Sequence, residues 1–367
     1  MTRVATFVKK NVVMLIALGA ALITMLFVPP DVEYLGYFDF KTLTCLFCVL
    51  AVVCALRGIQ FFYMLAQKIV ACFKTTRMCI LALVYITFIG SMLIANDMAL
   101  LTFLPLGYLV LSSTHKERHM AFTFIMQNIA ANLGGMLTPF GNPQNLYLYT
   151  KFQIDNGEFI RIMAPPFLVS VVLITVCCLF IPSEPLKMEG APLHLDPKRT
   201  VLYLLLFALS IAIVFRGIPY YIGLLVIPTV LFFADRHALR EVDYPLLLTF
   251  VFFFIFSGNM ARIPAVQELF STLLQKNTLL VSVLSCQVIS NVPSAILLSQ
   301  FTNDYTALLV GVNIGGVGTL IASLASLITF REYGKHAPGQ TGRYVVLFSA
   351  FNFTFLLLLT VMEHIVL

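Results

Sequence analysis

Long runs of apolar residues without charges constrain this chain more than any other feature. A helix of about 20 such residues crosses the hydrocarbon core of a bilayer. We predict nine crossings, at residues 11–29, 42–56, 119–150, 159–182, 200–216, 218–234, 244–258, 304–330 and 344–365. Two further apolar stretches, 78–112 and 277–301, carry polar residues in the middle. We predict that they are re-entrant hairpins, which enter and leave the membrane on one side.

The composition excludes a soluble protein. Of the 367 residues, 60% are hydrophobic and 11% are charged, whereas a soluble domain has about 25% charged residues. The eight cysteines lie mostly in apolar runs, and the C-x-x-C of Cys45 and Cys48 is interpreted as two small apolar residues. We expect an all-α polytopic membrane protein that needs no nucleic-acid partner and no cofactor. Because common hydrolase, zinc-protease and P-loop motifs are absent from the sequence, we do not expect an enzyme.

The basic residues predict an orientation in the membrane. With the two hairpins in place, 17 of the 23 Lys and Arg residues fall on one side. The positive-inside rule makes that side cytoplasmic. We therefore predict a cytoplasmic amino terminus, an external carboxyl terminus and a bacterial inner (plasma) membrane location.

A polar segment divides the chain into two parts of similar size. We predict a first repeat over 1–182, a cytoplasmic linker over 183–199 and a second repeat over 200–367. The first repeat would contain scaffold helices (1–77) and then a hairpin with a broken helix (78–150). The second would contain its own hairpin (277–301) and broken helix (304–330). Within the scaffold, residues 57–77 mix apolar and basic residues, which favours an amphipathic helix on the cytoplasmic surface over a solvated linker.

The two halves repeat the same order of breaks. Residues 95–97 (Ala-Asn-Asp) interrupt the first hairpin and residues 290–293 (Ser-Asn-Val-Pro) the second, and an N-x-G-G break follows in each half, at 132–135 and 313–316. The charge assignment opens the two hairpins to opposite sides, which makes the repeat inverted. Inverted repeats with broken helices are typical of secondary transporters, whose sites lie where the repeats meet. Freed carbonyls at a break can bind a cation, and a new helix N-terminus can face an anion.

Asp97 is the only ionisable residue that we place within the membrane. It is interpreted as a cation ligand or a protonatable coupling group, and the alternative is an N-cap for the helix over 98–112. We predict that a cation binds, or coupling occurs, at Asn96, Asp97, Gly134, Thr138, Ser290, Asn291, Gly316 and Gly318. Na⁺ is the only metal expected there. We predict a substrate-binding set of Asn96, Asn142, Asn145, Asn291 and Thr319.

Four segments carry a family resemblance. They read ANDMALLTFLPL (95–106), NLGGMLTPFGNPQNLYLY (132–149), SNVPSAILL (290–298) and GVNIGGVGTLIASLASLI (311–328). These segments resemble the ion transporter superfamily, which includes citrate transporters, divalent-anion/sodium symporters, arsenite permeases and NhaD-type antiporters. In the sodium-coupled carboxylate branch each hairpin tip reads Ser-Asn-Thr, so the resemblance carries over Asn96, Asn291 and Ser290. The A-N-D-x-A-L run is more similar to the arsenite-permease and NhaD side.

The resemblance implies a homodimer whose hairpin-bearing parts move as elevators against scaffold helices. We expect a secondary active transporter of a small anion, a carboxylate or an inorganic oxyanion, coupled to Na⁺ or H⁺. Two alternatives stay open, a Na⁺/H⁺ antiporter and an arsenite efflux permease.

Overall fold

The computed structural model describes residues 11–185 and 195–366, and every regular element within them is a helix. Residues 1–10, Leu367 and part of the predicted linker (186–194) lie outside the described residues. Seven helical segments are long and apolar enough to cross a membrane. The prediction of an all-helical, polytopic membrane protein is therefore confirmed.

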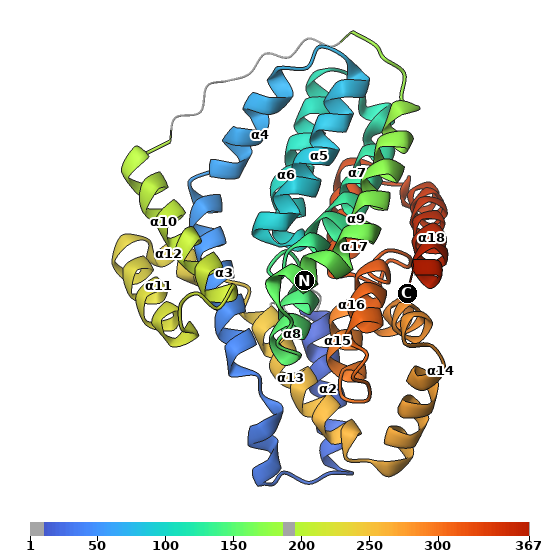
Figure 1. Ribbon diagram of the computed structural model, residues 1–367. Coiled ribbons are helices and arrows are strands. Elements are labelled where there is room, and N and C mark those ends of the chain that lie inside the picture. Colours follow the sequence, from blue (N-terminus) through green and yellow to red (C-terminus); the bar gives the residue numbers. More distant parts are fainter. Residues whose placement is uncertain (1–10, 186–194, 367) are drawn as a thin grey trace.

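The first half of the chain follows the predicted spans closely (Figure 1). Its elements are α2 (Val12–Met25), η1 (Val32–Tyr37), α3 (Phe40–Gly58), α4 (Phe61–Ala71), α5 (Thr76–Ile94), α6 (Asn96–Ser113), η2 (Glu117–His119), α7 (Met120–Gly134), η3 (Gly135–Leu137), α8 (Pro143–Lys151) and α9 (Asn156–Leu179). The first predicted hairpin corresponds to α5 and α6, and the helix within 57–77 is the short α4.

The second half departs from the predicted spans at one helix. Its elements are α10 (Pro197–Val214), α11 (Tyr220–Ala234), α12 (Arg236–Arg240), α13 (Tyr244–Ala261), α14 (Pro264–Ile289), α15 (Asn291–Leu298), α16 (Tyr305–Ile314), α17 (Leu324–His336) and α18 (Thr341–Val366). The sequence reading begins the hairpin at 277, but α14 already begins at Pro264 and kinks at Asn277. Asn277 has non-helical backbone angles and its Oδ1 accepts a hydrogen bond from the Leu280 N–H (2.8 Å). Asn277 therefore ends one helical part and caps the next.

Aspartates at helix starts explain where several helices begin. Five of the described α-helices begin with an aspartate whose side chain accepts hydrogen bonds from their first free N–H groups. These are Asp39 at α3, Asp196 at α10, Asp235 at α12, Asp243 at α13 and Asp304 at α16. Such caps satisfy orphan donors, and their charge suits the positive end of the helix dipole. Many of the few acids in this apolar chain thus set helix boundaries.

The helices form two groups with interrupted helices between them. Figure 1 shows α10, α11 and α12 gathered around α3 on one side of the molecule, and the three helices all pack against α3. On the other side α5, α6, α7 and α17 pack together, with α9 and α18 beside α7. The short helices α8, α15 and α16 pack on one another. Helix α3 of the first group contacts α8, and α13, which packs mainly against α2, contacts α15.

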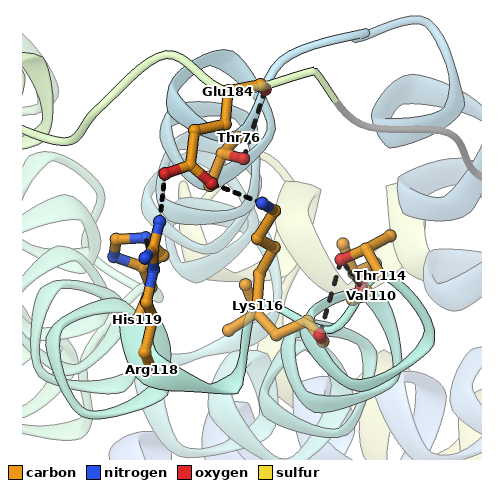
Figure 2. A network of polar contacts seen from close by, with 8 residues as sticks. Thr76, Val110, Thr114, Lys116, Arg118, His119 and Glu184 are labelled. Carbon is orange, nitrogen blue, oxygen red and sulfur yellow. Dashed lines mark hydrogen bonds and ion pairs between the residues drawn. The ribbon is translucent and has the colours of Figure 1, made fainter.

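An ionic cluster fixes the chain where α9 ends (Figure 2). The Glu184 carboxylate accepts hydrogen bonds from Lys116 and Arg118, and its backbone carbonyl accepts one from the Thr76 N–H (2.9 Å). Arg77 donates to the carbonyl of Ile181 (2.6 Å). The segment that leaves the first half is therefore tied to the start of α5 and to the turn before α7.

Candidate functional site

The first interruption lies between α7 and α8. The α7 helix ends at Gly134, and α8 begins at Pro143, which needs no N–H partner at the first helical position. A Cβ on Gly134 would lie 2.2 Å from the carbonyl oxygen of Phe88, so only glycine lets α7 approach α5 here. The freed carbonyls are bound by Asn145, whose Nδ2 lies 3.2, 3.2 and 3.3 Å from the oxygens of Gly135, Met136 and Thr138. One buried amide thus stabilises the break.

The second interruption lies between α16 and α17, and Gln287 stabilises it in the same way. Its Nε2 donates to the carbonyls of Gly315 (2.9 Å) and Val317 (3.3 Å), and its Oε1 accepts from the Thr319 N–H (2.9 Å). The backbone passes through Gly318 with φ of 135°, a region that favours glycine. Both helix breaks are therefore ordered by an amide side chain from the same half of the chain.

The two hairpin tips share an unusual backbone. Ala95 separates α5 from α6 with φ of 64° and ψ of 149°, and Ser290 separates α14 from α15 with φ of 74° and ψ of 159°. This region is nearly restricted to glycine, and other residues adopt it at a cost of about 1–3 kcal/mol. Such strain persists where the surrounding structure requires it, commonly at functional sites.

Each tip binds the interruption of its own half. The N–H of Asn96 donates to the carbonyl of Gly141 (3.1 Å), and the N–H of Asn291 donates to the carbonyl of Ala322 (2.9 Å). Each Asn side chain also accepts from the next N–H, that of Asp97 or Val292 (both 2.9 Å). The two halves thus repeat these two hydrogen bonds at their tips.

Both tips lie close to Asn132, and the first tip binds it. Its Oδ1 accepts hydrogen bonds from Asn96 Nδ2 (3.2 Å) and from Ser323 Oγ (2.8 Å). A Cβ on Gly316 would lie 3.0 Å from Asn291 Nδ2 and 3.5 Å from Asn132 Oδ1, so the second tip lies near Asn132 with Gly316 between them. The side chains of Asn96, Asn132 and Asn291 are all buried. This brings together residues from both halves that the sequence separates by almost 200 positions.

Further amides join the two interruptions. Asn142 Nδ2 donates to the Asn132 carbonyl (3.1 Å) and to Asn313 Oδ1 (3.1 Å), which also accepts from Gln144 Nε2 (3.3 Å). Asn313 Nδ2 in turn donates to Asn145 Oδ1 (2.6 Å). Among the described residues, the buried side-chain oxygens of Asn142 and Gln144 have no hydrogen-bond partner. Two neutral oxygens therefore stay available in the core of the site.

Comparison with known proteins places this architecture in a family. Residues 1–304 match the family model described as citrate transporter. The chain belongs to the citrate transporter family. It is 31% identical to an uncharacterized transporter of Methanocaldococcus jannaschii, over 91% of this chain and 92% of that protein. It is also 30% identical to the inner membrane protein YbiR of Escherichia coli, over 74% of each chain. The predicted resemblance to ion transporter superfamily permeases is thereby confirmed.

In this citrate transporter family protein, the predicted site residues fall into two groups. Asn96, Asn291 and Gly316 gather around Asn132, and Asn142 and Asn145 belong to the amide network. The others shape the backbone. Three hydroxyls donate to backbone carbonyls: Thr138 Oγ1 to Met92 (2.7 Å), Ser290 Oγ to Ala322 (3.2 Å) and Thr319 Oγ1 to Gln287 (3.1 Å). Gly134 permits the close approach of two helices, and Gly318 permits a positive φ. Their roles in binding stay predictions.

Asp97 stands apart from the amide network. It occupies the first turn of α6, but its side chain makes no capping bond there. Its Oδ1 is buried and has no hydrogen-bond partner within the described residues. No group of three or more His, Cys, Asp or Glu side chains suited to a metal ion occurs in the part of the chain that the structure describes. The prediction that Asp97 is the only ionisable residue in the membrane is wrong, because Glu363 is buried in α18, within the predicted span 344–365, and its Oε1 also has no partner among the described residues.

The sequence reading missed three side chains at or near the site. Gln287 sits in the apolar second part of α14, where a lone amide was the available signal. Gln144 sits in α8 beside Asn145 and bonds to Asn313. Asp243 caps α13 and faces the first hairpin, although its sequence position suggests only a loop. None of these three side chains has a counterpart in the other half of the chain, so the repeat pattern did not reveal them.

Proposed function

We propose that this citrate transporter family protein is a secondary active transporter that moves a small anion across the membrane, coupled to Na⁺ or H⁺. The observation that carries the proposal is the convergence of two strained hairpin tips, Ala95–Asn96 and Ser290–Asn291, on Asn132 between two interrupted helices. Broken helices around a buried polar point are typical of transporter sites, where helix ends and carbonyls replace water around the solute.

The chemistry of the site favours an anion held without a fixed positive charge. The gathered side chains are amides and hydroxyls, and the N-termini of α6, α8 and α15 begin at the site. Helix N-termini and amide N–H groups bind carboxylates and oxyanions. A carboxylate or an inorganic oxyanion is therefore the proposed substrate, and Asp97 is the proposed coupling group.

The arrangement also supports an elevator movement. The first hairpin lies beside the start of α13, because Asp97 and Asp243 line the same cavity. In the predicted orientation the start of α13 is on the cytoplasmic side, so the hairpin tip would face the cytoplasm here. Displacement of α5, α6 and α7 past α3 and α13 would move the tip toward the other side. A homodimer built on the α3 group is proposed from the family resemblance.

Transport in proteoliposomes tests this function. The purified protein would be supplied with labelled citrate, phosphate or arsenate under an imposed Na⁺ or pH gradient. We expect accumulation of one anion above its external concentration, and loss of that accumulation in Asp97→Asn while facilitated exchange persists. Equal accumulation by the variant would remove Asp97 from coupling. Failure of every anion to accumulate would contradict the proposed function.

A second candidate, Na⁺/H⁺ antiport, is favoured by the unpartnered carboxylate of Asp97. The same vesicles separate the two. An antiporter would change the internal pH when Na⁺ is added without any anion, whereas an anion transporter requires its substrate for ion movement.

A further inference from the structure

A small cavity lies where the first hairpin contacts the scaffold helices. It has room of about 20 Å³, close to the minimum that admits one water molecule. The hairpin contributes Ala95, Asp97 and Met98, and α3 contributes Leu46 and Leu50 on the opposite side. The start of α13 closes the cavity with Asp243 and Leu246. The cavity is therefore shared between two groups of helices.

Two carboxylates face this otherwise apolar space. Oδ1 of Asp97 is buried without a hydrogen-bond partner among the described residues. Asp243 uses Oδ1 to accept the Leu246 N–H (3.0 Å), and it lines the same cavity as Asp97. Among the described residues that line the cavity there is no Lys, Arg or His. The cavity thus brings two acids together without a basic partner.

Two negative charges are unfavourable in such a cavity. A pair of carboxylates that share a site of low polarity holds one proton between them, because both cannot ionise together. A metal cation would need about six oxygen ligands, whereas the wall here is mostly Leu, Val, Met and Phe side chains. A proton needs no such shell, so the cavity favours a proton over Na⁺.

We propose that Asp97 and Asp243 together form a proton-binding site between the first hairpin and α13, and that binding of one proton stabilises this contact. This proposal rests on the proposed function and deepens it. It names H⁺ as the coupling ion and Asp243 as the second residue that binds the proton. When the hairpin moves away from α13, Asp97 loses its neighbour and meets water, and the shared proton leaves. Proton release is thereby tied to movement of the hairpin.

The surrounding charges are compatible with this role. Cys54 Sγ of α3 donates a hydrogen bond to the carbonyl of Glu241 (3.4 Å), which places the segment just before Asp243 against α3. Arg57 follows Cys54 by three residues on α3 and has the opposite charge to Glu241. The hairpin and α8 contribute no further charged side chain to the described cavity lining. The proton therefore belongs to the pair, and removal of either acid changes its affinity.

Infrared difference spectroscopy on the whole protein in liposomes tests the proposal, because a protonated carboxylic acid has its own C=O band. Glu363 of α18 is a second buried acid with an unpartnered oxygen, so the spectra are recorded in a Glu363→Gln background. In that background we expect a band that titrates and is lost when Asp97→Asn is added. In Asp243→Asn the midpoint should fall by about one pH unit, a tenfold weaker proton binding. Asn and Ser both cap helices, so Asp243→Ser provides a second variant that keeps the start of α13. The matched control is Asp304→Asn, because exposed Asp304 caps α16 through the Ala307 N–H in the same way.

The outcomes separate this proposal from the proposed function. An unchanged midpoint in both Asp243 variants, or displacement of the band by Na⁺ at constant pH, would overturn the shared proton site. Either result is compatible with anion accumulation by the wild type, which is measured on the same liposomes. If the band shifts as expected but no anion accumulates, the proton site stands and the proposed substrate class fails.

Discussion

Asn132 is the residue on which the two halves converge. Its side-chain oxygen accepts from the first tip and from Ser323, and its backbone carbonyl accepts from Asn142. Replacement by alanine would leave Asn96 Nδ2 and Ser323 Oγ without this acceptor in a buried site. An unsatisfied buried donor costs about 1–3 kcal/mol.

We therefore expect Asn132→Ala to lower the free energy of unfolding by about 1–3 kcal/mol and to abolish transport. Denaturant titration in detergent and uptake in proteoliposomes measure the two effects. Asn128→Ala is the matched control, because Asn128 is equally buried one turn earlier and bonds to Ser326 and Thr329 rather than to a tip. It should lose stability but keep transport. Loss of transport in both variants alike would show that Asn132 acts only through stability.

For single residues, the sequence predicted the position of those that occur at matching breaks in both halves. Asn96 and Asn291 stand at matching breaks, and the structure brings both to one point. The roles of Asn145 and Gln287 were not predictable, because a carbonyl acceptor many residues away leaves no periodic signal. The role of Asn145 in substrate binding stays a prediction, and the structure adds that its Nδ2 binds three backbone carbonyls.

The hairpin tips are the elements whose backbone is strained. Ala95 adopts φ of 64° with ψ of 149°, which glycine adopts freely. We expect Ala95→Gly to raise the free energy of unfolding by about 1 kcal/mol, measured by chemical denaturation in detergent. Ala99→Gly, a few residues further along α6, has ordinary helical surroundings and should lower it by about 0.5–1 kcal/mol. A decrease for both variants would show that the tip stores no strain.

The sequence predicted the ends of helices correctly where a local motif marks the end. The breaks at Gly134 and at Ile314–Gly315 coincide with the predicted N-x-G-G motifs. The early start of α14 was missed because residues 264–276 are too polar for a membrane span, although Pro264 is a usual first helical residue. Helix length was thus less predictable than helix interruption.

The Glu184 cluster is a feature of the whole molecule, since it ties the end of the first half to two other helix starts. The hydrogen bond from Lys116, with a further one from Arg118, holds the pKa of the Glu184 carboxyl below its usual value. A group whose folded-state pKa is lowered contributes stability above its unfolded pKa and loses it as pH falls. The cluster should therefore stabilise the fold at neutral pH and cease to do so once Glu184 is protonated.

We expect Glu184→Gln to lower the melting temperature at pH 7 and to match the wild type at about pH 4 and below, near the ordinary carboxyl pKa. Thermal unfolding across this range measures the difference. Glu117→Gln, at an exposed neighbouring position, should follow the wild-type curve throughout. A Glu184→Gln deficit that persists unchanged at low pH would contradict the electrostatic origin.

At the scale of the whole molecule, the sequence predicted the class of protein but not which distant helices lie side by side. The apolar runs identified a helical membrane protein, and the structure and the family match agree. The two-carboxylate cavity is lined jointly by the starts of α6 and α13, which are far apart in the sequence. Nothing local to Asp97 or Asp243 indicates that contact.

The most direct test of the central claim is gradient-driven anion accumulation in proteoliposomes that contain the purified wild-type protein. The account predicts that an imposed inward proton gradient concentrates one small anion inside above its external level, and that an uncoupler abolishes this concentration. Anion entry that stops at equal concentrations with or without the gradient would contradict coupled transport and identify a passive pathway.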